Sequence, residues 1–563
     1  MDTGSQESAT QREHLPKLCG ADIEVGNFIL GSNRQGGTGG EAARALLREI
    51  EGVPRDERKT AGHTRDYDSH YGGSDYSYGR YYGGSYGYDS QDWGRKFLKS
   101  NGGCVYIDLD HLELCLPEVV SAHDWVACWH AMLRIARRAM MDANEGLGDG
   151  RKIQVLINNS DGLGHSYGSH LDFLVTRRAW DNLFHRKLHQ LLYLASFQVS
   201  SIVFTGQGKV GAENGTPAVG FQLSQRADFF ETLTGSQTTS NRPIVNSRDE
   251  ALCGRSRSEE SGMARLHCIF YDSNLCHAAN LLKIGSMQIM LAMIEAERIN
   301  PSLILDDPVE AVVCWSHDPS LKATARMASG QELTAVEAQL LFLEEAKRFC
   351  EEGGCEGIVP RADDILALWE DTLLKLKDGN LSALSSRLDW VLKLSVLQQV
   401  IGQHPELDWE SPAVKQLDHL YSSLDPSEGL YWAYERSGLV EAHATEAEIA
   451  RFAENPPDDT RAYARAMLLR RAGAGGVDSI DWDSIRFKRK GKKKYYWPTY
   501  RTLDLSNPLA FSRAHTEALF ADGASLDDIL DTLGSRESDS YSNWSWKSAV
   551  GSVSTNGGND NET

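Results

Sequence analysis

The sequence of 563 residues has no run of about 20 apolar residues, so we expect no segment of it to cross a bilayer. Its first residues, MDTGSQESATQREHLPK, are polar and lack the apolar core of a secretory signal. Its ten cysteines include no C-x-x-C pair, and the shortest of these spacings runs from Cys350 to Cys355. This pattern predicts free thiols in a reducing cytoplasm, not a disulfide framework or a structural zinc site.

Basic residues are also scarce, with 58 Lys and Arg against 79 Asp and Glu and a formal net charge of -21. Nucleic acids and anionic membranes attract cationic surfaces, so neither is expected as a partner. The common phosphate-binding signatures are absent as well. The glycine-rich stretch at 206–215 lacks the Ser or Thr that follows the lysine of a P-loop, here Lys209.

The chain does have enough apolar residues, 41%, to build cores, and its length suggests roughly two to four domains. A Tyr/Gly-rich stretch without aliphatic anchors marks an inserted loop, and a Pro-Pro break at 454–459 marks a domain boundary. We therefore predict a flexible tail over 1–18, a catalytic domain over 19–455 with an inserted loop over 53–95, a small C-terminal domain over 456–534 and a second flexible tail over 535–563.

Periodicity predicts an α+β protein in which strands are mixed with long helices. The predicted strands cover 20–31, 152–159, 199–206 and 264–272. Helices are predicted at 41–50, after Ser121, at 280–297 and through most of 331–453.

Two strand-like segments carry acidic residues that face the same way. Residues two apart share a strand face, so Asp22 lies beside Glu24, and Tyr106 lies beside Asp108. Clustered carboxylates repel one another unless they are solvated or bind a cation, and Mg²⁺ prefers oxygen ligands of this kind. With Glu113 added, we favour a magnesium-binding bowl over a solvated strand face.

Three arginines, Arg226, Arg248 and Arg265, stand in short polar segments. Guanidinium groups suit bidentate contact with phosphate or carboxylate, so they predict a nucleoside triphosphate with magnesium beside the acidic bowl. An ion pair with the acidic residues that follow it would explain Arg248 equally well. His170 and His267 are candidate ligands or proton carriers, although a lone histidine is more often structural.

Several short motifs occur in a fixed order: YIDLDHLELCLPE, INNSDGLGHSYGSH, GFQLSQRAD, NRPIVNSRDE, RLHCIFYDSN and NPPDDTRAY. In this order the chain resembles the Pup ligase and Pup deamidase/depupylase family over roughly residues 20–532. DGLGHSYGSH, TGQGKVG and ENPPDDTRAY are more similar to the deamidase/depupylase branch. The resemblance implies a glutamine-synthetase-like carboxylate-amine ligase fold, an antiparallel sheet cradle with helices plus a small C-terminal domain.

The resemblance also implies residue roles. Asp108 would be the catalytic aspartate, and the magnesium sites would be lined by Asp22, Glu24, Tyr106, Glu113 and His170. The phosphates of ATP, or of ADP plus phosphate, would face Arg226, Arg248, Arg265 and His267. Arg461 would reach from the small domain toward the nucleotide, and Trp482 would lie near the adenine.

The implied function is a cytoplasmic, ATP- and Mg²⁺-dependent amide-bond enzyme with a link to a bacterial proteasome system. It would deamidate the C-terminal glutamine of a Pup-like modifier or cleave the modifier's isopeptide bond to substrate lysines. The alternatives are ligation of a modifier glutamate to lysine and non-catalytic binding of nucleotide and modifier.

This chain also departs from the family pattern. The family's Glu-Asn-Tyr after SYGSH is replaced by Leu171, Asp172 and Phe173, and its Pro-His after RDE by Ala251 and Leu252. Loss of the carboxylate at Leu171 could remove a metal ligand or a substrate contact, and Asp172 could compensate for it. This loss favours the alternative of non-catalytic binding. The retained Asp108 favours an enzyme.

Overall fold

The computed structural model describes residues 14–32, 37–55, 93–148, 150–250, 262–473, 475–488, 499–520 and 523–539. Most of the predicted tails and of the Tyr/Gly-rich loop lies outside these residues. The N-terminal tail predicted to reach residue 18 ends earlier, because Leu15 and Leu18 are buried and Lys17 forms a buried ion pair with Glu295. Likewise, residues 536–539 form a strand and do not belong to a tail.

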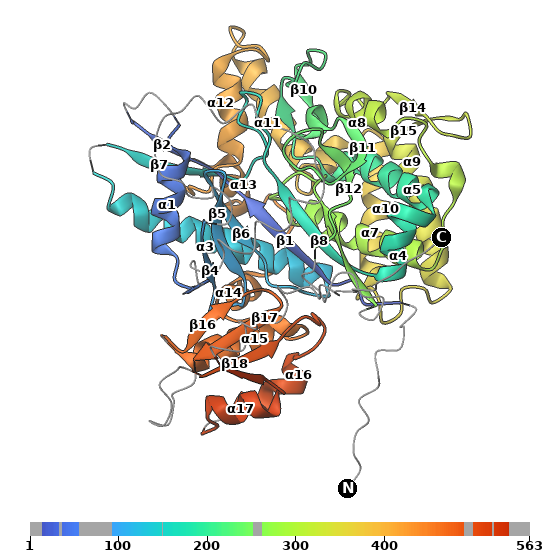
Figure 1. The fold of residues 1–563 in the computed structure, drawn as a ribbon. Helices are drawn as coiled ribbons and strands as arrows, with labels where there is room; N and C mark the ends of the chain where they lie inside the picture. The colour runs from blue at the N-terminus through green and yellow to red at the C-terminus, as the bar shows by residue number, and fades with distance from the viewer. Residues whose placement is uncertain are drawn as a thin grey trace, which may run out of the picture.

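A seven-stranded sheet in the order β13-β8-β1-β6-β5-β4-β3 forms the centre of the molecule (Figure 1). Every neighbouring pair in it is antiparallel. Its strands are β1 (Cys19–Glu24), β3 (Val53–Pro54), β4 (Trp93–Phe97), β5 (Cys104–Asp108), β6 (His111–Cys115), β8 (Ser169–Thr176) and β13 (Met263–Cys268). The predicted strand at 20–31 is divided in two, because β2 (Gly26–Leu30) leaves this sheet and pairs with β7 (Lys152–Leu156).

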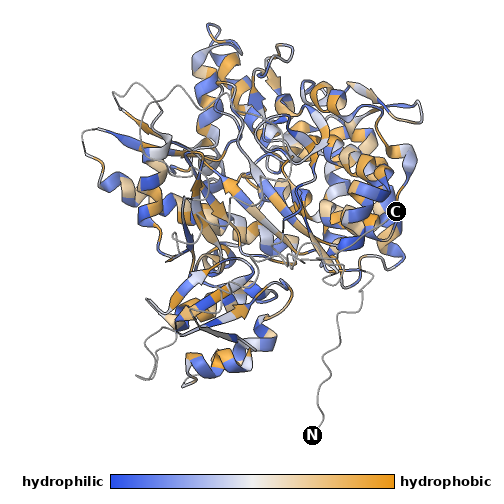
Figure 2. Ribbon diagram, viewed as in Figure 1, coloured by the Kyte–Doolittle hydropathy of each residue, from blue (hydrophilic) through white to orange (hydrophobic). Residues whose placement is uncertain are grey.

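Three helices cover one face of this sheet: α1 (Gly39–Glu49), α3 (Ala122–Glu145) and α7 (His277–Glu295). Ile23 of β1, Val105 of β5 and Leu114 of β6 point toward them and join one continuous buried cluster. Figure 2 shows the strands at the centre of the molecule as largely hydrophobic. Because strand residues alternate between faces, Asp22, Glu24 and other polar residues of the same strands lie on the opposite face.

Further helices pack beside the sheet, and those beyond residue 331 confirm the helical pattern predicted over 331–453. They are α4 (Arg177–Asp181), α5 (Leu188–Ser200), α6 (Ile202–Thr205), α8 (Pro308–Ser316), α9 (Ala335–Glu351), α10 (Ala362–Lys377), α11 (Asp389–Gln403), α12 (Pro412–Tyr421), α13 (Leu430–Arg436) and α14 (Glu446–Glu454). Short strand pairs between them are β9 (Lys209–Val210) with β10 (Phe221–Gln222), β11 (Thr232–Gly235) with β12 (Pro243–Asn246), and β14 (Thr324–Arg326) with β15 (Glu332–Thr334).

The strand predicted at 199–206 is wrong, since these residues belong to α5 and α6. The segment is buried on all sides, and that pattern does not separate a buried strand from a buried helix. Its hydroxyl groups bond within the helices: Ser200 Oγ donates to Ser196 O at 2.7 Å, and Thr205 Oγ1 donates to Ser201 O at 3.0 Å.

A C-terminal unit follows α14 and contains a four-stranded sheet (Figure 1, bottom). Its elements are α15 (Arg461–Ala472), β16 (Val477–Ile480), β17 (Ser484–Lys488), β18 (Thr499–Asp504), α16 (Arg513–Thr516), α17 (Leu526–Thr532) and β19 (Arg536–Asp539). Its apolar core also includes Phe97, Cys104, Tyr106 and Cys115 of the central sheet. The unit thus packs on the face of the sheet that carries the acidic residues; a domain boundary at 455/456 remains a prediction.

The prediction of free thiols throughout is wrong at one place, where Cys350 and Cys355 form a disulfide. The chain reverses after α9 at Gly353, whose φ of 85° is in the left-handed region, and this brings the two Cα atoms to 5.0 Å. The other seven cysteines among the described residues are free. None of the helices in the described ranges is both long enough and apolar enough to span a membrane.

Candidate active site

The strand register brings the predicted acidic residues together on one face of the sheet. Tyr106 of β5 pairs with Glu113 of β6, which pairs with Glu24 of β1. One step along the strands, Asp22 lies opposite His170 of β8. Four adjacent strands therefore contribute side chains to a single patch, as the sequence predicted for the two acidic pairs.

This patch forms the floor of a cavity of about 1060 Å³, large enough for a nucleotide and part of a peptide. Of the sequence-predicted site residues, eleven line it: Asp22, Glu24, Tyr106, Asp108, Glu113, His170, Arg226, Arg248, Arg265, His267 and Trp482. Arg461 does not line this cavity.

The carboxylates of the patch strongly disfavour one another's charge. Burial, followed by repulsion from Asp172, raises the pKa of Asp22. Burial together with Glu24 and Asp22 raises the pKa of Glu113 well above its usual range. Glu113 Oε2 is buried and has no hydrogen-bond partner in the described parts of the chain. A cation placed here would relieve both effects.

Ligand atoms of Asp22, Glu113 and Cys115 lie within 4.8 Å of one another, a spacing that fits a metal ion. Burial, with His267 and Arg226 nearby, lowers the pKa of His170 well below its usual range, so its imidazole is neutral and able to bind a metal. Among the predicted ligands, Glu24 has one carboxylate oxygen occupied by the backbone N–H of Gly168. The residues present therefore fit a divalent cation, and Asp22 and Glu113 would be its central ligands.

Asp108 is the last residue of β5, and a two-residue turn follows it. Leu109 and Asp110 in that turn have φ values of 44° and 72°, both in the left-handed region that disfavours residues with side chains. His111 begins β6 directly opposite Asp108, and its Nδ1 lies 2.9 Å from Val25 O. The tight turn fixes the backbone of Asp108 at the cavity wall, which suits a catalytic carboxylate.

Within the described residues, two arginines in the cavity wall form hydrogen bonds only to neutral groups. Arg226 donates from Nη1 to Tyr167 O and from Nη2 to Ile269 O at 2.9 Å. Arg242, which the sequence analysis did not select, donates from Nε to Thr238 O and from Nη2 to Ser166 O. Burial and the nearby Arg242 lower the pKa of Arg226 to about 9. Two such guanidinium groups form a site for an anion.

Arg265 and His267 are, in contrast, already paired. Arg265 Nε donates to Asp172 Oδ1 at 2.7 Å, and its Nη1 donates to Glu250. His267 Nδ1 lies 2.9 Å from the same Asp172 oxygen. Burial opposes ionisation of Asp172, but Arg265 and His267 outweigh it and hold its pKa well below the usual range. This cluster is an internally compensated wall of the cavity, with Arg248 at an exposed position 3.5 Å from Glu250.

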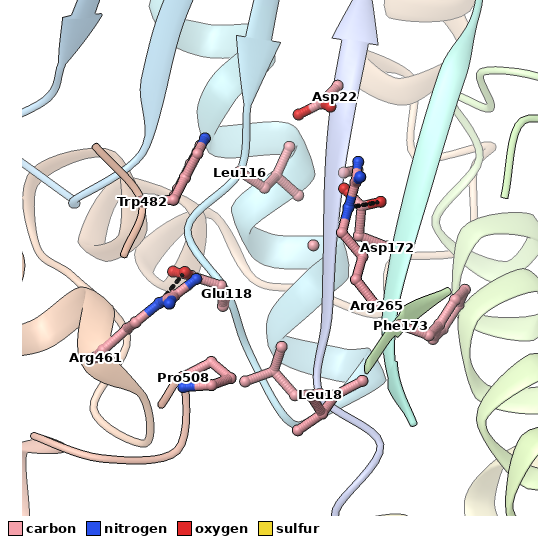
Figure 3. A pocket seen from close by; sticks show the side chains of 13 residues that line it. Leu18, Asp22, Leu116, Glu118, Asp172, Phe173, Arg265, Arg461, Trp482 and Pro508 are labelled. Atoms are coloured by element: carbon pink, nitrogen blue, oxygen red, sulfur yellow. Dashed lines mark hydrogen bonds and ion pairs between the residues drawn. The ribbon is translucent and has the colours of Figure 1, made fainter. Parts of the chain in front are cut away.

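A smaller cavity continues from the large one toward the C-terminal unit (Figure 3) and shares Asp22, Arg265 and Trp482 with it. Arg461 lines this smaller cavity, where its Nε donates to Glu118 at 2.7 Å. The remaining wall is apolar, with Leu18, Leu116, Phe173 and Pro508. The structure therefore places Arg461 in the same small cavity as Trp482, but in an ion pair.

Residues 20–486 match the family described as Pup-ligase protein. The chain belongs to this family. A depupylase from Acidothermus cellulolyticus is 35% identical over 436 residues, covering 77% of this chain and 83% of that protein. A Pup deamidase/depupylase from Mycolicibacterium smegmatis is 34% identical over the same length and covers the same shares. These names agree with the branch that the motifs predicted.

Two solved structures share the fold. The Pup ligase PafA in complex with Pup has a TM-score of 0.70 at 24% identity, covering 92% of this chain and 95% of that chain. PafA in complex with ADP has a TM-score of 0.66 at 26% identity, covering 79% and 91%. The predicted α+β fold, an antiparallel sheet cradle with helices, is confirmed.

The departure of this Pup-ligase family member at residues 171–173 has a simple structural reading. Leu171 is fully buried on the helix-covered face of β8, opposite Ala21 and Cys268, so no carboxylate is missing from the cavity there. Asp172 lies on the cavity side, where it pairs with Arg265 and lies 2.9 Å from His267 Nδ1. The second departure, Ala251 and Leu252, lies outside the described residues.

Sequence reasoning missed Arg95 and Arg242, and gave Asp172 only a compensating role. The guanidinium of Arg95 lies over the ring of Tyr106, 4.0 Å from its centroid. The NRPI motif contained Arg242, but nothing in the sequence shows that its neighbours would be backbone carbonyls. The alternation of His170 and Asp172 in one strand was the available signal for Asp172.

Proposed function

We propose that this protein is an ATP- and Mg²⁺-dependent amide-bond hydrolase. It deamidates the C-terminal glutamine of a Pup-like modifier, cleaves the modifier's isopeptide bond to substrate lysines, or does both. One observation carries the proposal: Asp108 ends its strand beside a carboxylate bowl, in a cavity that also holds two buried arginines, Arg226 and Arg242, which form no ion pair with any described residue. The names of the two relatives support the same chemistry.

The ADP complex of PafA supports nucleotide binding by this chain. We assign the adenine to the smaller cavity, where Trp482, Leu18 and Pro508 offer apolar surface. The phosphates would then extend over the sheet toward Arg226, with Arg265, His267 and Arg248 along the wall. Magnesium held by Asp22 and Glu113, with Glu24, Tyr106 and His170 around it, would neutralise charge on the phosphates and the carboxylates.

The residues of the chain perform three tasks in this scheme. Asp108 either attacks the amide carbonyl or takes a proton from the attacking water, and both routes require its ionised carboxylate. The rigid turn after Asp108 keeps that carboxylate in place. Arg226 donates hydrogen bonds in a buried setting, where a fixed positive charge stabilises developing negative charge strongly.

The partners would be a Pup-like modifier and its lysine-linked conjugates, with a bacterial proteasome system as a further connection. We also propose that the protein works in the cytoplasm, and the free thiols among the described residues support this. A second candidate function is ligation of a modifier glutamate to lysine, favoured by the structural similarity to the ligase PafA.

A single assay separates these functions. Purified protein is incubated with Mg-ATP and one of three Pup-like peptides: one ending in Gln, one ending in Glu with a lysine donor, and one already isopeptide-linked. Mass spectrometry of wild type and Asp108→Asn then follows the products. Conversion of the Gln amide to a carboxylate, or release of the conjugate, supports the hydrolase. A condensed product supports the ligase, and peptide binding without turnover contradicts both.

A further inference from the structure

The amide bond that this protein is proposed to hydrolyse belongs to the side chain of a C-terminal residue. That residue also carries a free α-carboxylate, roughly 5 Å from the reacting carbonyl carbon by ordinary bond lengths. A buried carboxylate is costly unless it is paired with a cation and hydrogen-bonded. An enzyme that accepts only the last residue of a modifier therefore needs a cationic group for this second anion.

Most cationic side chains of the large cavity already have a partner in the structure. Arg55 pairs with Asp481, Arg265 pairs with Asp172 and Glu250, Arg248 lies near Glu250, and Arg95 stacks on Tyr106. Within the described residues, Arg226 and Arg242 form no ion pair. Two arginines are thus available, and the two anions of the proposed reaction are the nucleotide phosphates and the substrate α-carboxylate.

The two arginines differ in their free donors. Both Nη atoms of Arg226 are bonded to carbonyls, and its Nε is buried without a partner among the described residues. Arg242 is only 6% exposed, yet its Nη1 has no hydrogen-bond partner within the described ranges, while Nε and Nη2 are held by Thr238 O and Ser166 O. Arg242 is therefore a rigid, desolvated guanidinium with one donor atom left for a ligand.

A short series of contacts connects Arg242 to the catalytic aspartate. Ser166, whose carbonyl accepts from Arg242, precedes Tyr167, and the centroid of the Tyr167 ring lies 4.5 Å from that of the His111 ring. His111 in turn lies directly opposite Asp108. Arg242 and Asp108 thus line the same cavity.

The position of Arg242 also separates it from the proposed adenine site. It immediately precedes β12, and Figure 1 shows β11 and β12 on the opposite side of β1 from the C-terminal unit, which contributes Trp482. A nucleotide whose base lies at Trp482 would approach from one side of the sheet, and a peptide would enter past the polar segment Thr238–Asn241 on the other.

We propose that Arg242 binds the α-carboxylate of the modifier's C-terminal residue and so places the side-chain amide beside Asp108. This inference rests on the proposed function. Arg242 undergoes no covalent change: water adds its oxygen to the amide carbon, the C–N bond breaks, and the departing amine or ammonia takes the proton. Arg242 is a specificity-determining residue that selects C-terminal over internal or amidated glutamine.

The test compares two modifier peptides that both end in glutamine, one with a free α-carboxylate and one with an α-amide. Wild type is expected to prefer the free carboxylate in kcat/KM by about 10- to 100-fold, the value of a charged hydrogen bond. Arg242→Gln is expected to lose this preference by slowing the carboxylate peptide alone. Arg242→Lys should restore part of it, and the exposed control Arg298→Gln should behave as wild type.

The affinity for ADP distinguishes this role from phosphate binding. Arg242→Gln should leave the Kd for ADP unchanged, whereas a matching loss of ADP affinity would overturn the assignment. Equal activity of wild type on both peptides would also overturn it while leaving the proposed function intact. No activity of wild type on either peptide, or on an isopeptide-linked conjugate, would remove the proposed function itself.

Discussion

Glu118 holds the C-terminal unit to the central sheet, and its replacement by glutamine is expected to loosen that junction. The carboxylate follows β6 and is 7% exposed. It accepts from Arg461 Nε at 2.7 Å and from Arg465 Nη1 and Nη2 at 3.2 and 2.5 Å. Glu118→Gln keeps the shape of the side chain but removes the carboxylate that these two buried arginines share. Breaking a buried ion pair in this way costs about 3–5 kcal/mol in the free energy of unfolding.

The pKa of Glu118 gives a second value for the same contribution. Burial raises it, but Arg465 and Arg461 outweigh burial and bring it to about 2, against an ordinary value of 4.5. This depression corresponds to about 3 kcal/mol. Because the folded-state pKa is the lower one, the stabilisation is present above about pH 4.5 and is lost as pH falls toward about 2.

Urea unfolding followed by tryptophan fluorescence at pH 7 and pH 3 measures both effects. Between pH 7 and pH 3, the free energy of unfolding should fall by about 2 kcal/mol more for wild type than for Glu118→Gln. Glu446→Gln, which removes an exposed ion pair with Arg134, is the control and should show no measurable change. A Glu118→Gln protein within about 1 kcal/mol of wild type at pH 7 would refute the reasoning.

Three further predictions concern the cavity. Asp108→Asn should lower turnover of a Gln-ending peptide about 100-fold or more while leaving ADP binding within about threefold in calorimetry, and retained turnover would argue against Asp108 as the reacting group. Leu171→Glu, which introduces the family's carboxylate, should destabilise the protein by about 4 kcal/mol or more in urea unfolding, because it places a charge among helix-packed apolar residues; a stable variant would show that this side chain reaches the cavity. Adding Mg²⁺ to metal-free protein should raise the thermal midpoint of wild type more than that of Glu113→Gln, and an equal rise in both would mean that Mg²⁺ binds elsewhere.

The acidic patch could be predicted from the sequence because a strand has a strict period of two. That period placed Asp22 with Glu24 and Tyr106 with Asp108, and the observed register joined the two pairs through Glu113. The period does not reveal register, however, so it could not show which side chain would pair with which carboxylate. Asp172 lies opposite His267 only because β8 and β13 are neighbours with that pairing.

Other features were hidden from the sequence for different reasons. Burial on all sides makes a helix and a strand look alike, which led to the wrong strand at 199–206. The disulfide depends on a chain reversal at Gly353, which spacing alone does not specify. Arg242 is held in place by two backbone carbonyls. Every residue has a backbone carbonyl, so the sequence does not indicate which arginine will be held in this way. Asp110 lines the cavity and has a left-handed backbone. Its position in the turn explains why an aspartate stands there, and no chemical role needs to be assigned to it.

The core that the C-terminal unit shares with the central sheet contains two cysteines whose reactivity reports whether the unit is packed on the sheet. Cys104 and Cys115 face each other across β5 and β6, directly beneath the unit, and are 0% and 1% exposed. Burial raises the pKa of the Cys115 thiol well above its usual range, so alkylating reagents should not react with it while the unit is packed on the sheet. The rate at which these two thiols are labelled is therefore a direct measure of how often the C-terminal unit separates from the central sheet.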